Sequence, residues 1–133
     1  MADDDEDSKI EQARPLVLRL IVASPAKFLD YVLVPGHPSG KDGIFLGRFS
    51  YRPRNEEDAR TLAASYMEQA RHSLETGDVE IDEEDEFGRR VVIAIEVRGV
   101  LVRSAWLLRP DGTFDLVTPF SGFVRRRRER RAQ

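Results

Sequence analysis

Residues 90–120, RVVIAIEVRGVLVRSAWLLRPDGTFDLVTPF, decide the fold class that we expect for this chain. They contain three runs rich in Val, Ile and Leu, a composition typical of strands. The runs are residues 90–97, 100–108 and 114–120. Arg98-Gly99 and the sequence PDGT at 110–113 separate the runs and favour tight turns. The stretch therefore predicts an antiparallel meander, in which Pro119 places the end of the last strand either at an edge of the sheet or outside the hydrogen-bonded ladder.

The clearest helix precedes the meander, at residues 56–75. Asn55 can cap this helix, and the acidic residues of its first turn favour the helix dipole. Apolar residues recur at the spacing of one buried helical face, and Gly77 is a suitable stop. The apolar positions are 59, 62, 63, 66, 67, 70 and 74.

Shorter elements are expected before this helix. Residues 15–23 are mostly apolar and β-branched, which fits a short buried strand, although their periodicity is also compatible with a helix. Residues 24–33 fit a short helix, because Ser24 stands at a cap position and Pro25 at the first helical position. Residues 44–51 fit either a helical turn or a short strand.

Between the long helix and the meander, a short strand is expected at 78–81 and an acidic connection at 82–88. The predicted fold class is therefore α+β, with an N-terminal short strand and helices packed on a C-terminal antiparallel β-meander.

The chain has 133 residues, a length typical of one domain, which we place at residues 14–123. Charged segments flank this domain on both sides. An acidic arm at 1–13 carries five negative charges in residues 3–7, and a basic tail at 124–133 carries six arginines and one glutamate in residues 125–131. Charge of this density predicts that both arms are disordered.

Composition excludes several classes of site. No apolar run is long enough to span a bilayer, and the acidic N-terminus lacks the basic start of a secretory signal. We therefore expect no membrane partner and a cytoplasmic location, unless a specialised secretion system exports the protein. Cysteine is absent, and His37 and His72 are not at the spacing of a metal motif. We expect no cofactor and no metal, and the oligomeric state stays open.

The stretch VLVPGHPSGKDG, residues 32–43, holds the first candidate site. A histidine can move protons near neutral pH, and a nearby lysine can stabilise an anionic phosphate. The residues between His37 and Lys41 could hold both side chains on one surface. Alternatively, the prolines and glycines simply form a turn in which His37 binds backbone carbonyls.

The strand at 100–108 supplies the second set of candidates. Alternation along a strand puts Ser104 and Trp106 on one face, and Arg103 and Ala105 on the other. A cation such as Arg103 and a hydroxyl such as that of Thr118 could bind a phosphodiester on an open face of the sheet. Trp106 could equally be a core residue.

Two segments together resemble the motifs of an uncharacterised bacterial domain family. DYVLVPGHPSGKDGIFLGRF is similar to the family's opening motif YLLNPEHPxGxxKAxFF, and VRSAWLLRPDGTFDLVTPF is similar to its closing motif VRTVWxIxxGxxxxLVTxYP. The resemblance covers residues 28–120. This family looks related to the barnase–EndoU–colicin–RelE class of small ribonuclease-fold toxins, and some members are C-terminal domains of bacterial polymorphic toxins.

By this resemblance, four residues match motif positions: His37, Lys41, Trp106 and Thr118. The chain departs from the motifs at Gly36, where the family has an acidic residue. The other departures are Gly43, Gly47 and Pro119-Phe120.

The resemblance implies a toxin-associated domain that acts as a metal-independent ribonuclease. His37 would move a proton to or from a ribose 2′-hydroxyl or the leaving oxygen, while Lys41 and Arg103 stabilise the charge on phosphate. Thr118 would hydrogen-bond the same phosphate. RNA and a cognate immunity or inhibitor protein are then the expected partners. The alternative is a non-catalytic protein- or nucleic-acid-binding module of the same fold, in which His37 and Lys41 only shape the loop.

Overall fold

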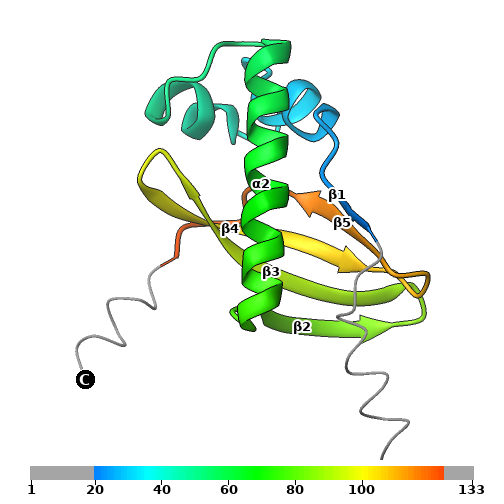
Figure 1. Ribbon diagram of the computed structural model, residues 1–133. Helices are drawn as coiled ribbons and strands as arrows, with labels where there is room; N and C mark the ends of the chain where they lie inside the picture. Colours follow the sequence, from blue (N-terminus) through cyan, green and yellow to red (C-terminus); the bar gives the residue numbers. More distant parts are fainter. Residues whose placement is uncertain (1–19, 125–133) are drawn as a thin grey trace, which may run out of the picture.

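The structure, a computed structural model that describes residues 20–124, contains a five-stranded sheet crossed on one face by a long helix (Figure 1). The strand order is β1-β5-β4-β3-β2. The strands are β1 (Leu20–Val22), β2 (Glu80–Asp85), β3 (Gly88–Val97), β4 (Val100–Leu108) and β5 (Thr113–Thr118). The predicted acidic arm and, apart from Val124, the predicted basic tail lie outside the described residues. So do residues 15–19 of the first predicted strand.

Strands β2 to β5 form an antiparallel meander, and β1 joins the same sheet as a parallel neighbour of β5. The α+β prediction is confirmed. Arg98 and Gly99 form the two-residue turn between β3 and β4, with φ of 49° and 85°. Positive φ at both positions gives a turn whose twist matches that of the flanking strands. β5 ends at Thr118, directly before Pro119, as the sequence predicts.

The acidic connection predicted at 82–88 is wrong. β2 continues through Asp85, and after two turn residues β3 begins at Gly88. The prediction failed because it relied on the low frequency of Asp and Glu in strands. Every residue of β2 is exposed, and the strand lies at the edge of the sheet. Charged side chains are tolerated on an edge strand, where they also discourage pairing with other chains.

The long helix α2 (Glu56–Thr76) has the predicted position and local signals. The side chain of Asn55 accepts a hydrogen bond from the Asp58 backbone N–H at 2.9 Å, which caps the first turn. Gly77 ends the helix in the left-handed conformation, with φ of 78°. The predicted apolar stripe faces the sheet, and its innermost residues are buried. Those residues are Ala59, Leu62, Ala63, Tyr66 and Ala70.

Two short helical segments lie beside the N-terminal half of α2 (Figure 1). They are η2 (Phe28–Val32) and η3 (Gly43–Arg48), and both are π-helical. The backbone N–H of Leu33 donates to the Phe28 carbonyl, and that of Phe49 to the Ile44 carbonyl, each at 2.9 Å across five residues. η2 lies within the stretch 24–33 that was predicted to be helical. Residues 44–51 were compatible with a helical turn or a short strand, and η3 shows that the helical alternative is correct. Within residues 20–124, no helix is both long and apolar enough to cross a bilayer.

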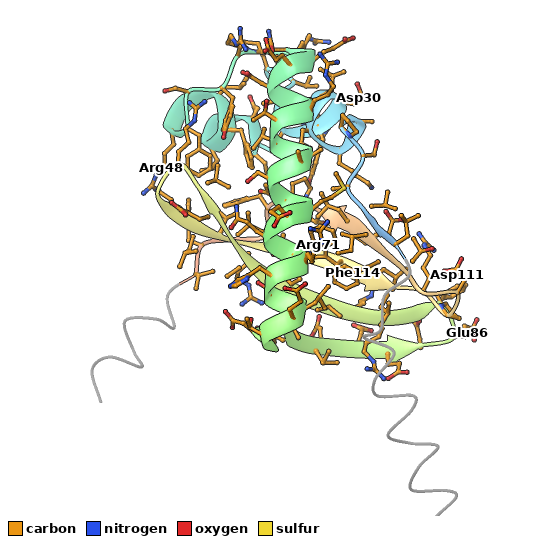
Figure 2. All side chains as sticks on the ribbon, in the orientation of Figure 1. Asp30, Arg48, Arg71, Glu86, Asp111 and Phe114 are labelled. Carbon is orange, nitrogen blue, oxygen red and sulfur yellow. The ribbon has the colours of Figure 1, made fainter. Side chains whose placement is uncertain are left out.

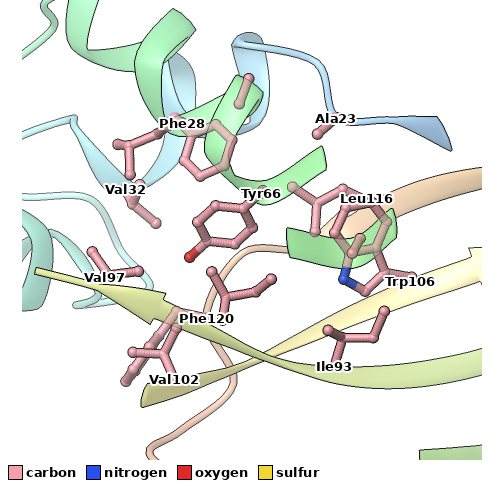
Figure 3. Close-up of a cluster of buried hydrophobic side chains, with 14 of the residues drawn as sticks. Ala23, Phe28, Val32, Tyr66, Ile93, Val97, Val102, Trp106, Leu116 and Phe120 are labelled. Atoms are coloured by element: carbon pink, nitrogen blue, oxygen red, sulfur yellow. The ribbon is translucent and has the colours of Figure 1, made fainter. Parts of the chain in front are cut away.

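Tyr66 lies in the middle of the core, among Phe28, Leu116 and Phe120 (Figure 3). Its ring meets that of Phe28 edge to face, with centroids 4.9 Å apart. Its hydroxyl donates a 2.9 Å hydrogen bond to the carbonyl oxygen of Pro119. Burial raises the pKa of the Tyr66 phenol, so this donor keeps its proton. The residue therefore ties α2 both to η2 and to the segment that follows β5.

Replacing Tyr66 tests this link. We expect Tyr66→Phe to lower the free energy of unfolding by about 1–3 kcal/mol, because the buried Pro119 carbonyl loses its partner. Urea unfolding followed by circular dichroism measures the change. Tyr31→Phe is the matched control, since the Tyr31 hydroxyl makes no hydrogen bond within residues 20–124, and it should cost less than about 0.5 kcal/mol. Equal losses in the two variants would contradict the assignment.

Candidate functional site

The candidate loop joins η2 to η3, and its own polar groups stabilise its shape. The backbone N–H of Gly36 donates to Asp42 Oδ2 at 2.8 Å, which closes the loop across six residues. Gly36 and Gly40 both have φ of 76°, a conformation that favours glycine. The backbone conformation therefore suits a glycine at position 36. Rare π-helices flank the loop on both sides, and such segments occur frequently at functional sites.

His37 is half-buried, and Ser39 holds its ring. Nδ1 of His37 lies 3.0 Å from Ser39 Oγ and 3.1 Å from the backbone nitrogen of Ser39. The N–H of Ser39 can donate to an unprotonated Nδ1, and its hydroxyl oxygen can accept from a protonated Nδ1. Nδ1 therefore keeps a partner whichever ring nitrogen carries the proton. Nε2 makes no hydrogen bond with any of residues 20–124, which leaves it available to a ligand.

Tyr31 brings His37 and Lys41 onto one surface. The imidazole meets the Tyr31 ring edge to face, with centroids 4.8 Å apart. The Lys41 ammonium nitrogen lies 5.4 Å from the centroid of the same ring. The sequence pattern did not single out Tyr31. The sequence feature that could have identified Tyr31 is its place in the segment DYVLVPGHPSGKDGIFLGRF. In the structure it is a half-buried residue of η2, the short helix that precedes the loop.

Arg103 and Thr118 lie elsewhere, on the face of the sheet opposite α2. Arg103 Nη1 is 3.4 Å from Glu80 Oε1, an ion pair that is partly exposed. Thr118 pairs with Ala105, whose side chain is on the same open face as Arg103. Among the described residues, no hydrogen bond or ion pair links either of them to His37 or Lys41. The structure thus brings together the two loop candidates, and separately places the two sheet candidates on one face.

A groove of about 310 Å³ opens on this sheet face. Arg103 and Glu80 provide its charged wall, and apolar side chains of β3 provide its floor. The lining residues are Asp78, Val79, Glu80, Val92, Ala94, Arg103 and Val124. The cation that could bind phosphate there is already paired with a carboxylate, so an anion would have to displace Glu80.

Trp106 belongs to the core. It is fully buried, its ring stacks on that of Phe114 with centroids 5.0 Å apart, and its Nε1 donates to Ser104 Oγ at 2.8 Å. The Ser104 hydroxyl in turn donates to the Ile93 carbonyl at 2.8 Å. Trp106 and Ser104 share the buried face of β4, as alternation predicts. Within residues 20–124, no three His, Asp or Glu side chains are grouped so that they could hold a metal ion.

Comparison with known proteins gives one result that covers most of the chain. A protein-family model described as Domain of unknown function (DUF6883) matches residues 17–122. The match agrees with the expectation of an uncharacterised domain family. No curated protein and no solved structure matches the chain.

The double role of Ser39 can be tested by nuclear magnetic resonance. Ser39→Ala removes the hydroxyl acceptor but keeps the backbone donor, so we expect the neutral His37 ring to shift toward the tautomer protonated at Nε2. Long-range 1H–15N spectra at alkaline pH report the proportions of the two tautomers. His72, exposed on α2, is the internal control and should not change. An unchanged His37 ratio would show that the hydroxyl has no part in holding the ring.

Proposed function

The chain belongs to the DUF6883 family, and we propose that it is a metal-independent ribonuclease in which His37 and Lys41 act on one phosphodiester of RNA. The observation that carries the proposal is that the His37 and Lys41 side chains both contact the Tyr31 ring, while Ser39 holds Nδ1 of His37. Proximity and fixed orientation of an acid–base group and a cation are what phosphodiester cleavage requires of a protein.

The reaction assigned to this pair is cleavage by the neighbouring ribose hydroxyl. The 2′-oxygen loses its proton and bonds to phosphorus, the bond from phosphorus to the 5′-oxygen breaks, and the 5′-oxygen gains a proton. The products are a 2′,3′-cyclic phosphate and a free 5′-hydroxyl. His37 Nε2 takes the first proton or delivers the second, and water provides the other transfer. The Lys41 ammonium stabilises the charge that builds on the phosphate oxygens.

Ser39 supports this role because it follows the protonation of His37. With the proton on Nδ1, the Ser39 hydroxyl oxygen accepts a hydrogen bond from Nδ1–H, and the lone pair of Nε2 is free to act as a base. With the proton on Nε2, the Ser39 N–H donates to Nδ1 instead. The ring can therefore change protonation state without losing its position.

Arg103 and Thr118 have a lesser part in this proposal. Their open face of the sheet is separate from the loop, so they would bind RNA away from the reacting phosphate. Arg103→Gln is then expected to weaken RNA binding without slowing the chemical step.

An inhibitor protein is also part of the proposal, because an unrestrained ribonuclease would degrade the RNA of the cell that makes it.

A second candidate function is RNA or protein binding without cleavage. The observation in its favour is that the hydrogen bonds of His37 and Ser39 all stay within the loop, which also fits a purely structural turn. In that case His37 and Lys41 shape the binding surface and move no proton.

Cleavage of a fluorophore–quencher RNA in the presence of EDTA tests the proposal. We expect His37→Ala to lower the rate by about 100-fold or more, the contribution of a general acid or base. Lys41→Ala should also lower the rate, whereas Tyr31→Phe should not, because it keeps the ring on which both side chains lie.

Matched controls are His72→Ala and Lys27→Ala, which remove the same side chains at exposed positions elsewhere. Both should cleave as the parent protein does. Cleavage that survives His37→Ala at the parent rate would overturn the catalytic assignment. RNA binding by a parent protein that cleaves nothing would support the second candidate.

A further inference from the structure

The tip of the β3–β4 hairpin reaches the end of η3, one of the two helical segments that flank the candidate loop (Figure 1). Arg98 occupies this tip, and its Nη1 donates to the carbonyl oxygen of Phe49 at 2.6 Å, 49 residues away along the chain. The Arg98 guanidinium also lies over the Tyr51 ring, 3.9 Å from its centroid. Figure 2 shows Arg48, the last residue of η3, beside the same hairpin tip. One side chain of the sheet therefore contacts the residues that follow η3.

Both residues that Arg98 contacts are bonded back to η3. The backbone N–H of Phe49 donates to the Ile44 carbonyl at 2.9 Å, and that of Tyr51 donates to the Phe45 carbonyl at 3.0 Å. The Phe49 ring is buried and meets that of Phe45 edge to face. The Phe49 carbonyl stands past the end of a helical segment, where carbonyls have no partner within the helix. The guanidinium supplies that partner, and a charged donor makes the bond a strong one.

η3 also begins on the carbonyl group of Lys41. The backbone N–H groups of Ile44 and Phe45 donate to this carbonyl at 3.1 Å and 3.3 Å. The same two residues offer their own carbonyls to the residues after η3, as described above. A continuous set of backbone bonds therefore leads from the carbonyl that Arg98 binds to the lysine of the candidate site.

The segment after η3 reaches the other end of the loop as well. The backbone N–H of Arg54 donates at 2.9 Å to the carbonyl of Leu33, the residue that follows η2. We call residues 49–54 the bridging segment, because it is bonded to η3 at its start and to η2 at its end. The candidate loop lies between η2 and η3, so the bridging segment fixes the distance between the two ends of the loop. The spacing of the side chains within the loop depends on that distance.

Backbone strain gathers in the bridging segment and in the arginine that holds it. Within residues 20–124, the non-glycine residues with positive φ are Ser50, Arg54 and Arg98, at 61°, 50° and 49°. Positive φ is unfavourable for arginine, and a two-residue turn of this type favours Asn, Asp or Gly at position 98. Strain of this kind persists where the surrounding contacts hold it, and it gathers at functional sites. Arg98 is therefore supported by its contacts with the bridging segment rather than by its own turn.

We propose that Arg98 is a positioning residue of the candidate site, which acts through the bridging segment to hold His37 and Lys41 at a fixed spacing. Its guanidinium contacts the bridging segment rather than either of these side chains. The inference rests on the proposed function, because the spacing of an acid–base group and a cation matters to a reaction at one phosphate. It makes the hairpin tip, an element of the sheet, part of the geometry of the loop.

Nuclear magnetic resonance of the full chain tests this link and requires no cleavage. In the parent protein, nuclear Overhauser effects should connect the Tyr31 ring protons with the His37 ring and with the Lys41 side chain. We expect Arg98→Asn to weaken or abolish the effects to Lys41, because η3 loses its link to the hairpin. The His37 ring signals should move toward those of the exposed His72. Asparagine tolerates positive φ, so the hairpin keeps its turn in this variant.

Arg109→Asn is the matched control. Arg109 lies on the β4–β5 hairpin, where its guanidinium pairs with Asp115 at 2.9 Å, and its replacement should leave the loop signals unchanged. Arg98→Lys is a second variant, which keeps a cation and a donor but lacks the planar guanidinium. It should change the loop signals in the same direction as Arg98→Asn and by a smaller amount. Circular dichroism checks the fold of each variant, and Arg98→Lys decides the test where Arg98→Asn does not fold.

Cleavage of the fluorophore–quencher RNA gives a second readout. We expect Arg98→Asn to lower kcat by about tenfold or more and to change KM by less than about twofold, since a displaced catalytic pair slows the chemical step and leaves the RNA contacts intact. A rise in KM at unchanged kcat would assign Arg98 to RNA binding and overturn the inference.

Unchanged loop signals in a folded Arg98 variant would also overturn it, as would equal changes in Arg98→Asn and Arg109→Asn. A parent protein that cleaves no RNA would refute the proposed function. The loop signals would then still show whether Arg98 holds the loop, so the two failures can be told apart.

Discussion

The buried contacts of Tyr66 hold together the parts of the molecule that the sheet alone does not join. Its ring packs against Phe28 of η2, and its hydroxyl binds the carbonyl of Pro119, 53 residues further along the chain. Phe120, the next residue, meets Phe45 of η3 edge to face. The two π-helical segments are therefore fixed relative to the end of β5 through one buried side chain and its neighbours. Without this bond, a buried carbonyl would lose its partner.

The position of the candidate loop follows from that packing. The loop begins where η2 ends and finishes where η3 begins, so both of its ends are attached to the core. Its polar contacts, from Gly36 to Asp42 and from His37 to Ser39, then need only fix the few residues between them. A histidine with one nitrogen held and the other unbonded within the described residues is a consequence of this arrangement. Rigid support of this kind is what an acid–base group requires.

The molecule also separates its charges, and this separation is a property of the sheet. Acidic side chains follow β2 on one edge, where they are exposed and discourage pairing with other strands. Arginines gather at the far end of β3, where two of them are backed by aromatic rings rather than by carboxylates.

The sequence by itself determined the elements whose signals are local. α2 could be predicted from Asn55, its apolar stripe and Gly77, and the meander from strand composition and its turns, because caps and turns depend on residues close in the chain. Only the tertiary structure decided the pairing of β1 with β5, the helical state of η3 and the strand at 80–85, since burial and edge position come from distant segments. The same holds for the site. His37 and Lys41 could be named from their loop, but their shared contact with Tyr31, and the separate face of Arg103 and Thr118, come from packing that no local pattern encodes.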